Sequence, residues 1–272
     1  MQGAFSAAPL RALLAAGHSI VSVVVPEQQV DTGAAAPPAA DGALHLHRDD
    51  TINGIAEQSG IPIICFQANA GLPVCDVMVV ACFSRRIPRP VRALARRAAV
   101  NLHPSRLPEF RGPAPLFWQL RAGMRSVGVS LHLVTDELDG GPLVGQCMVA
   151  LPTGAGGREL DTLLADAGSA LLIDALARGD FEATAQVGEP SVQGWPAAAD
   201  WLVPCEWRVL RAFNFMRGTA DWGGVYTVAA TRRRLAVRTV LGYRLDSAEP
   251  GVVREVAGGL EIGFTDGWLT VI

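Results

Sequence analysis

The sequence predicts an α/β protein with a parallel sheet in its first part and a small β-rich unit at its C-terminus. Over the first two-thirds of the chain, short β-branched runs alternate with helical stretches, which is the pattern of a parallel sheet covered by helices. Residues 186–204 interrupt this alternation, and short strand-like runs separated by glycine follow them. We therefore predict a Rossmann-like domain over 1–185, a linker over 186–204 and a small β-barrel-like domain over 205–272.

Each expected element follows from hydrophobic spacing and β-branched content. Runs of β-branched or apolar residues predict strands over 20–25, 62–66, 77–82, 100–102, 128–134 and 145–151. Apolar residues at helical spacing predict helices over 8–17, 51–59, 90–98, 114–122 and 159–178. In the last part we expect a helix near 206–216 and strands over 223–229, 235–240 and 260–264. The pattern opens with a helix, whereas a doubly wound sheet normally opens with a strand.

Length and composition exclude several classes of protein. A chain of 272 residues can bury an α/β core and still form a small second domain. No apolar run reaches the roughly 18 residues of a membrane span, and no signal pattern opens the chain, so we expect a soluble cytoplasmic protein. The five cysteines form no CxxC pair, and we expect neither disulfides nor a metal site. A net charge of −3 argues against a nucleic-acid binder dominated by phosphate contacts.

Two polar side chains stand at the end of a predicted strand. Asn101 and His103 lie two residues apart, so both can point to the same face of the sheet. The ends of parallel strands are where α/β folds place their chemistry. Prolines at 104, 108, 113 and 115 stiffen the loop that follows. These features predict a preorganised site at Asn101 and His103.

A second polar stretch, residues 134–142, comes directly after another predicted strand. Its carboxylates are Asp136, Glu137 and Asp139, and two glycines follow that let the backbone approach a flat ligand. A carboxylate beside His103 would fix the imidazole tautomer and raise its basicity. We therefore expect the two stretches to meet in one cleft.

The two stretches read Asn101-Leu-His-Pro-Ser-Arg-Leu-Pro108 and Leu138-Asp-Gly-Gly141. They match an Asn-x-His-x-Ser-x-Leu-Pro loop and a Leu-Asp-x-Gly turn, so the chain resembles the folate-dependent formyltransferase superfamily. The resemblance implies a Rossmann-like catalytic domain followed by an OB-like domain. It also implies 10-formyltetrahydrofolate as the formyl donor, no metal, and Asn101, His103 and Asp139 as the catalytic residues.

The same resemblance assigns residues to cofactor and substrate. It implies that the folate pocket is formed by Phe83, Ser84, Arg85, Arg86, Ile87, Val134, Thr135, Asp136, Glu137, Leu138 and Gly140. It implies a substrate loop that comprises Ser105, Leu107, Pro108, Arg111 and Gly112. The remaining histidines, His18, His45, His47 and His132, are expected to have no chemical role.

A mechanism follows from these residue types. The acceptor amine attacks the formyl carbon, and the tetrahedral adduct carries an oxyanion. We expect the Asn101 amide and a protonated His103 to donate hydrogen bonds to that oxyanion. Asp139 would orient His103 and help to move the proton from the amine to the folate nitrogen.

The acceptor is the least determined part of this prediction. The layout most resembles methionyl-tRNA formyltransferase, because a small β domain with an Arg211-Ala-Phe-Asn214 motif follows the linker. Against tRNA, residues 26–50 hold five acids and one arginine, and an acidic segment repels phosphates. Residues 205–272 hold nine arginines and seven acids, a small excess for a phosphate-binding domain. We therefore expect a small-molecule amine or hydroxylamine as acceptor, with methionyl-tRNA as the alternative.

Two further alternatives remain open. One is a hydrolase of formyl-folate, in which water is the acceptor. The other is a non-catalytic folate- or RNA-binding relative. Intact Asn101, His103 and Asp139 favour an enzyme, because a binding module would not need all three.

Overall fold

A computed structural model describes residues 4–26, 51–66, 71–231 and 234–272. Most of the acidic stretch within 26–50, together with His45 and His47, lies outside the described residues. Among the helices of the described part, none is long and apolar enough to cross a membrane.

The N-terminal elements form a small unit of two helices and two strands. They are α1 (Ala4–Ala15), β1 (Val23–Pro26), α2 (Thr51–Gln58) and β2 (Ile63–Phe66). Strands β1 and β2 pair in parallel, with Val23 opposite Ile63. Leu10 of α1 and Ala56 of α2 belong to the same small hydrophobic cluster as β1, so the helices cover this two-stranded sheet. A β–α–β connection of this kind is what the alternating pattern predicted.

The main sheet carries the predicted site. Its strands are β3 (Cys75–Ala81), β4 (Ala95–His103), β5 (Ser126–Leu133) and β6 (Leu143–Ala150), in the order β3-β4-β5-β6. Strands β3 and β4 are parallel, and β5 and β6 continue the sheet in antiparallel pairing. The predicted α/β class with parallel strands is confirmed, and the antiparallel half is an addition to it.

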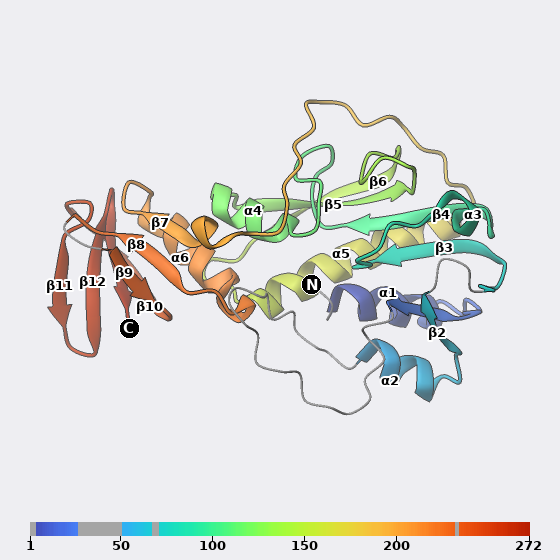
Figure 1. The fold of residues 1–272 in the computed structure, drawn as a ribbon, viewed down its shortest axis with the longest axis horizontal. Coiled ribbons are helices and arrows are strands. Elements are labelled where there is room, and N and C mark those ends of the chain that lie inside the picture. The colour runs from blue at the N-terminus through green and yellow to red at the C-terminus, as the bar shows by residue number, and fades with distance from the viewer. Residues whose placement is uncertain (1–3, 27–50, 67–70, 232–233) are drawn as a thin grey trace.

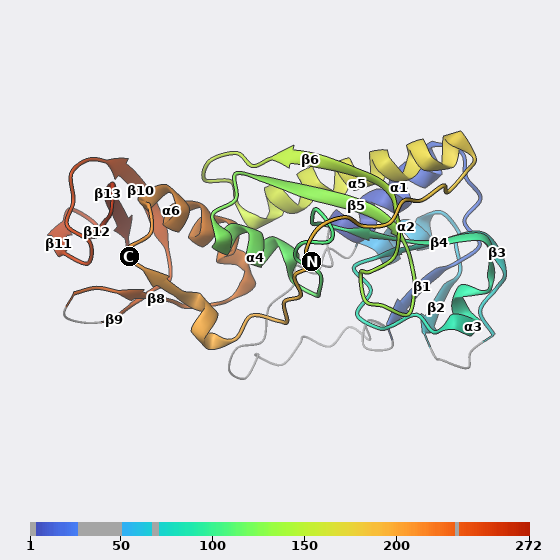
Figure 2. The same cartoon turned by 90° about the horizontal axis from the view of Figure 1, so that it is seen from above.

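Two helices cover one face of the main sheet. The long helix α5 (Gly157–Arg178) runs along it and packs beside α1 (Figure 1). A Cβ at Gly168 of α5 would lie 3.2 Å from the Val129 side chain and 3.6 Å from Phe5. The absence of a side chain at Gly168 therefore brings α5 close to β5 and α1 at the same point. Helix α4 (Pro115–Ala122) follows the loop that leaves β4 and leads towards the C-terminal part (Figures 1 and 2).

One predicted helix is wrong. Residues 90–98 were expected to be helical, but α3 (Arg89–Arg92) has four residues and β4 already begins at Ala95. The helix propensity of alanine and arginine is overridden by pairing, since Ala95 lies opposite Cys75 and Ala98 opposite Val77 on β3. Alternate β4 residues from Ala98 onward face the core, as strand geometry requires.

The C-terminal part is β-rich, as predicted. It contains β7 (Leu202–Pro204), α6 (Val209–Gly218), β8 (Tyr226–Ala229), β9 (Arg234–Val237), β10 (Val240–Leu245), β11 (Val253–Val256), β12 (Gly259–Phe264) and β13 (Gly267–Val271). Strands β7, β8 and β9 form one sheet, and β10, β13, β12 and β11 form an antiparallel second sheet. Strands β7, β11 and β13 were not expected from the sequence, and the single strand expected over 235–240 is divided into β9 and β10.

One aromatic cluster connects α4 with the C-terminal part. The ring of Phe117 lies 5.2 Å from Trp201 and 5.2 Å from Phe215 of α6, and it stacks on Trp222 at 5.8 Å. Phe117 and Phe215 are fully buried. The main hydrophobic core therefore continues without interruption from the main sheet into the C-terminal sheets.

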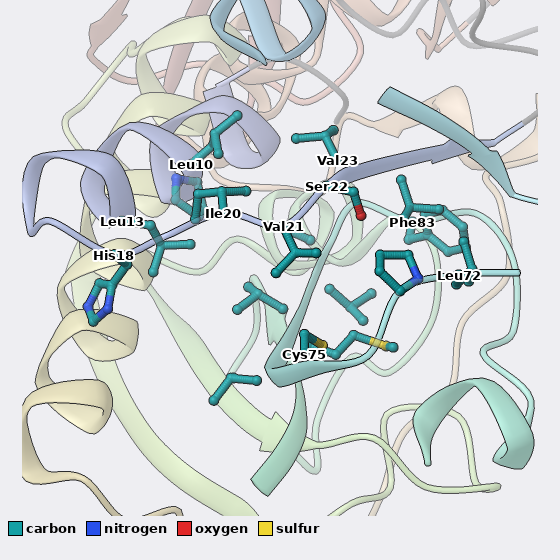
Figure 3. Close-up of a pocket in the computed structure, with 18 of the residues that line it drawn as sticks. Leu10, Leu13, His18, Ile20, Val21, Ser22, Val23, Leu72, Cys75 and Phe83 are labelled. Carbon is teal, nitrogen blue, oxygen red and sulfur yellow. The ribbon is translucent and has the colours of Figure 1, made fainter. Parts of the chain in front are cut away.

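A cavity of about 560 Å³ separates the two-stranded sheet from the main sheet. Figure 3 shows Val21 and Ser22 on one side of it and Cys75 on the other, and Val23 also belongs to its lining. The cavity is lined by consecutive residues of 19–24 and of 75–81, whereas a strand that presents one face to a cavity would contribute alternate residues. The cavity therefore lies at strand edges, and among the described strands β1 pairs only with β2 and β3 only with β4.

Candidate functional site

Four polar side chains converge at the end of β4. Asn101 and His103 come from β4, His132 comes from β5, and Asp139 lies in the turn between β5 and β6. Asn101 is directly opposite His132 in the antiparallel pairing, which places the two side chains next to each other. His103, His132 and Asp139 are 4%, 2% and 8% exposed, so the cluster is almost entirely removed from bulk water.

The Asp139 carboxylate lies at the centre of this cluster. Its Oδ2 accepts a hydrogen bond from the Gly112 backbone N–H at 2.9 Å. Its Oδ1 lies 3.4 Å from Asn101 Nδ2, 3.7 Å from His103 Nδ1 and 3.7 Å from His132 Nε2. The structure thus brings together the three residues predicted to be catalytic, and it adds His132.

The hydrogen bonds determine which ring nitrogens carry protons. His132 Nδ1 lies 2.9 Å from the Leu133 carbonyl, which can only accept, so Nδ1 is the donor. In the neutral ring Nε2 then accepts, and Asn101 Nδ2 donates to it at 3.0 Å. By the same argument His103 Nε2 donates to the Phe110 carbonyl at 3.0 Å. The unprotonated Nδ1 of neutral His103 therefore faces Asp139.

Burial and charge set the protonation states. Burial lowers the pKa of His103, although Asp139 and the Phe110 carbonyl oppose this, so the resting imidazole is neutral at pH 7. Burial alone would raise the pKa of Asp139, but hydrogen bonding and positive charge from the His132 and His103 rings when they are protonated, together with the Gly112 N–H, outweigh it and hold that pKa below its ordinary value. The resting site therefore pairs a carboxylate with a neutral imidazole.

The predicted substrate loop, residues 105–112, is anchored by its own hydrogen bonds. The Ser105 hydroxyl donates to the Glu109 carbonyl at 2.7 Å. Ser130 Oγ on β5 donates to the Ser105 carbonyl at 2.7 Å and accepts from the Leu107 N–H at 3.2 Å. Ser105 and Leu107 thus shape the loop through these bonds, and Pro108 follows them in the same buried turn.

Arg111 and Gly112 complete the loop at the site. Arg111 is buried, and its guanidinium contacts the Glu137 carboxylate in the Asp139 turn. Gly112 has a φ of +119°, and a Cβ there would lie 2.0 Å from the Gln193 carbonyl oxygen, so only glycine fits. Both residues therefore tie the substrate loop to neighbouring segments.

The two predicted cofactor segments, 83–87 and 134–140, lie side by side. Arg92 of α3 joins them, because its Nη1 donates to the Ile87 and Thr135 carbonyls, each at 3.0 Å. Its Nη2 forms an ion pair with Asp136 at 2.6 Å, which lowers the pKa of that carboxyl. This role of Arg92 was not predicted, because no motif includes it.

Other members of the predicted cofactor set lie at the surface. Ser84, Arg85 and Arg86 are exposed, and Leu138 is 47% exposed. Phe83 is half-buried and its ring meets Phe66 edge-to-face at 5.2 Å. Ser84, Arg85, Arg86 and Leu138 are therefore exposed, whereas Phe83 lines the cavity beside β3.

Sequence reasoning missed His132 as a member of the site. The signal was present in β5, where Ser130 and His132 are polar residues two apart in an otherwise apolar strand and so share one face. Both are buried and both contact site segments. Among the described residues, no group of three His, Cys, Asp or Glu side chains is arranged to hold a metal ion.

Known proteins resemble this chain in sequence and in fold. The model of the formyl transferase family matches residues 66–176. A methionyl-tRNA formyltransferase of Chloroflexus aurantiacus is 31% identical over 82% of this chain and 73% of its own length. That of Acidobacterium capsulatum is 29% identical over 98% of this chain and 88% of its own length. The chain therefore belongs to the folate-dependent formyltransferase family, and it is an enzyme of that class.

Solved structures support the fold. An N-formyltransferase from Helicobacter canadensis, in complex with folinic acid and dTDP-3-aminofucose, superposes with a TM-score of 0.67 at 14% identity, over 98% of this chain and 94% of that one. HypX from Aquifex aeolicus, in complex with tetrahydrofolic acid, superposes with a TM-score of 0.56 at 18% identity, over 100% of this chain and 42% of that one. At these identities the likeness shows a shared fold.

Proposed function

We propose that this enzyme transfers a formyl group from 10-formyltetrahydrofolate to the amine of a small-molecule acceptor. The observation that carries the proposal is the buried Asp139 carboxylate, whose Oδ1 lies 3.7 Å from His103 Nδ1. A base that is neutral in the resting site and flanked by a carboxylate suits proton transfer from an amine.

The proposed reaction exchanges one bond at the formyl carbon for another. 10-Formyltetrahydrofolate supplies the formyl carbon, whose bond to the folate nitrogen is replaced by a bond to the acceptor nitrogen. His103 Nδ1 accepts the proton that the amine loses and returns it to the departing folate nitrogen. Asp139 stabilises the imidazolium that exists between these two steps. The proposed reaction therefore begins with neutral His103, whereas a protonated His103 was expected from the sequence.

Asn101 has a separate part in this scheme. One of its N–H groups is bonded to His132 at 3.0 Å, and the other has, among the described residues, only the 3.4 Å contact with Asp139. The second N–H can exchange this long hydrogen bond with Asp139 for one to the oxygen that becomes negative during transfer. His132 orients the amide, because its Nε2 can only accept while Nδ1 donates to the Leu133 carbonyl.

The residues present fit a folate-type donor. Arg92 holds the backbone of residues 83–87 beside that of 134–140, which leaves main-chain groups of two loops to recognise a flat ring. Arg111 Nε is buried and has no hydrogen-bond partner within the described part of the chain, so the substrate loop retains a donor for a bound molecule. Arg85 and Arg86 are exposed, and we retain them as candidates for the folate tail.

The charge of the C-terminal part favours a small acceptor over tRNA. Arg208 pairs with Asp266 at 2.7 Å, Arg244 with Glu261 at 3.1 Å, and Arg254 with Glu261 at 2.6 Å. Arginines that are already paired with carboxylates contribute little to phosphate binding. We keep the division into a catalytic domain (1–185), a linker (186–204) and an OB-like domain (205–272) as part of the proposal.

Methionyl-tRNA is the second candidate acceptor, and sequence similarity favours it. The relatives from Chloroflexus aurantiacus and Acidobacterium capsulatum are both methionyl-tRNA formyltransferases. The alignment with the Acidobacterium capsulatum enzyme covers 98% of this chain, so that likeness extends into the C-terminal part.

One assay separates the candidates. Release of tetrahydrofolate from 10-formyltetrahydrofolate is followed with an amino-sugar nucleotide, a hydroxylamine, charged initiator tRNA, or no acceptor. We expect turnover with a small amine and none with tRNA. Turnover with tRNA alone would reverse the choice of acceptor, and release without acceptor would identify a hydrolase. Folate binding without release under any condition would favour a non-catalytic relative.

A further inference from the structure

The end of the predicted catalytic domain and the start of the predicted linker together contact both loops of the candidate site. Thr184 exchanges backbone hydrogen bonds with Leu143, at 2.7 and 2.9 Å, just after the Asp139 turn. Arg111 donates its N–H to the Ser191 carbonyl at 2.9 Å and accepts from the Gln193 N–H at 3.0 Å. Residues 184–193, which we call the brace, therefore lie along the site rather than apart from it.

Two residues of the site have backbone conformations that need support. Asp139 has a φ of 51° and Phe110 has a φ of 56°, and both lie in the left-handed region that non-glycine residues rarely adopt. Asp139 carries the central carboxylate, and the Phe110 carbonyl accepts the hydrogen bond from His103 Nε2. Such conformations persist only where surrounding contacts fix them.

The brace supplies those contacts through two side chains. Gln186 Nε2 donates to the Asp139 carbonyl at 2.7 Å and to the Gly141 carbonyl at 2.8 Å. Its Oε1 accepts from Arg111 Nη2 at 2.8 Å, so it links the Asp139 turn to the substrate loop. Ser191 Oγ accepts from the Phe110 N–H at 2.8 Å. Each of the two left-handed residues is thus held by one side chain of the brace.

We propose that Gln186 and Ser191 are positioning residues that hold Asp139 and Phe110 in place and thereby set the geometry between His103 and Asp139. The proposal rests on the proposed function, in which His103 and Asp139 carry out the transfer. Neither brace residue touches the reacting atoms. Their effect is on the rate of the chemical step, because small misplacements of reacting groups are costly there.

The first test uses Gln186→Met, which keeps the length of the side chain and removes its hydrogen bonds. Val187→Ala is the matched control, since Val187 is the next residue and is 87% exposed. We expect kcat with 10-formyltetrahydrofolate to fall about tenfold to a hundredfold in Gln186→Met, while KM changes by less than about threefold. The control should retain the wild-type kcat, and far-UV circular dichroism should be the same for both variants.

Ser191 offers a rescue experiment. Ser191→Ala removes the oxygen that accepts from the Phe110 N–H, whereas Ser191→Thr keeps it. We expect kcat to fall in Ser191→Ala and to be largely restored in Ser191→Thr. Equal losses in both variants would indicate a packing role and would overturn the assignment of Ser191.

A second readout does not depend on turnover. The titration of the His103 ring can be followed by NMR in the wild type and in Gln186→Met. Asp139 raises the pKa of His103 against burial, while His132 and Arg111 lower it. Displacing Asp139 should therefore move this pKa to a lower value.

The two proposals fail in different ways. A wild type without turnover on any acceptor would refute the proposed function. An unchanged His103 titration in Gln186→Met, with kcat also at the wild-type level wherever the wild type turns over, would refute the brace.

Discussion

Asp139 is the residue on which the other polar side chains of the site depend. Its Oδ2 is fixed by the Gly112 N–H, while Oδ1 lies within 3.7 Å of Asn101, His103 and His132. A buried carboxylate in this position stabilises positive charge on either imidazole. The electrostatic account of the site is therefore tested most directly by removing that charge.

Asp139→Asn keeps the shape of the side chain and removes its charge. We expect kcat/KM to fall about a hundredfold or more, because the imidazolium of His103 loses its partner. Asp139 raises the pKa of His103, so its loss lowers that pKa further. Protonated His103 cannot accept a proton, and the acid limb of the kcat/KM profile should therefore move to lower pH in the variant.

The control for this prediction is Asp174→Asn, a carboxylate of α5 that is 65% exposed and pairs with Arg178. Its profile should superimpose on that of the wild type. An acid limb that moves to higher pH in Asp139→Asn would contradict the assignment of His103 as the base.

The site residues that could be predicted from the sequence are those that belong to a short local motif. Asn101, His103 and Asp139 belong to two short motifs, and the structure brings them together. His132 and Gln186 have no motif of their own. His132 joins the site because the pairing of β4 with β5 places it opposite Asn101. Gln186 joins it because the chain returns to the Asp139 turn 47 residues later. Neither contact can be predicted from sequence spacing alone.

The loop between β4 and α4 depends on one glycine of β5. A Cβ at Gly128 would lie 2.5 Å from the backbone N and Cα of Arg106, so no side chain fits without displacing the loop. The loop carries Gly112, which in turn anchors Asp139. A substitution that adds a side chain at Gly128 should therefore affect both folding and activity.

Gly128→Ala is expected to lower the free energy of unfolding by about 1–3 kcal/mol, the usual cost of overpacking. Gly54→Ala is the matched control, because Gly54 lies in helix α2 and a Cβ there would meet no described atom within 4 Å. That change should leave stability equal or raise it by up to about 1 kcal/mol. Urea denaturation of both variants checks the pair, and equal stabilities would contradict the close approach.

Elements with strong periodicity were predicted well, and elements that depend on pairing were not. Helix α5 and strand β5 match the predicted ranges to within two residues at each end. The range 90–98 was misassigned because its alanines and arginines favour a helix in isolation, while β3 supplies a strand partner that sequence cannot reveal. Strand β11 was not predicted because Arg254 and Glu255 interrupt its apolar pattern, and it too forms by pairing with a neighbouring strand.

The whole molecule is held together by the aromatic cluster around Phe117 and Phe215. Phe215 is fully buried, and its ring lies 5.2 Å from Phe117, 5.8 Å from Tyr226 and 5.9 Å from Trp207. These residues come from α4, α6, β8 and the segment between β7 and α6. The catalytic and C-terminal parts therefore share one core, and we expect them to unfold together.

Phe215→Ala should lower the free energy of unfolding by about 3–5 kcal/mol, as for other buried aromatic deletions. In both the wild type and the variant, tryptophan fluorescence and far-UV circular dichroism should report one coincident transition. Val225→Ala, at a position that is 44% exposed, serves as the control and should change stability little. Two separate transitions in the wild type would show that the shared core does not couple the two parts.

In the proposed reaction His103 carries the proton during formyl transfer from 10-formyltetrahydrofolate to an amine. This role is tested most directly by the single-turnover rate of tetrahydrofolate release in the wild type and in His103→Ala, at saturating donor and acceptor. We expect this rate to fall about a hundredfold or more in His103→Ala, with the affinity for tetrahydrofolate unchanged. A variant that retains the wild-type rate would contradict this role of His103.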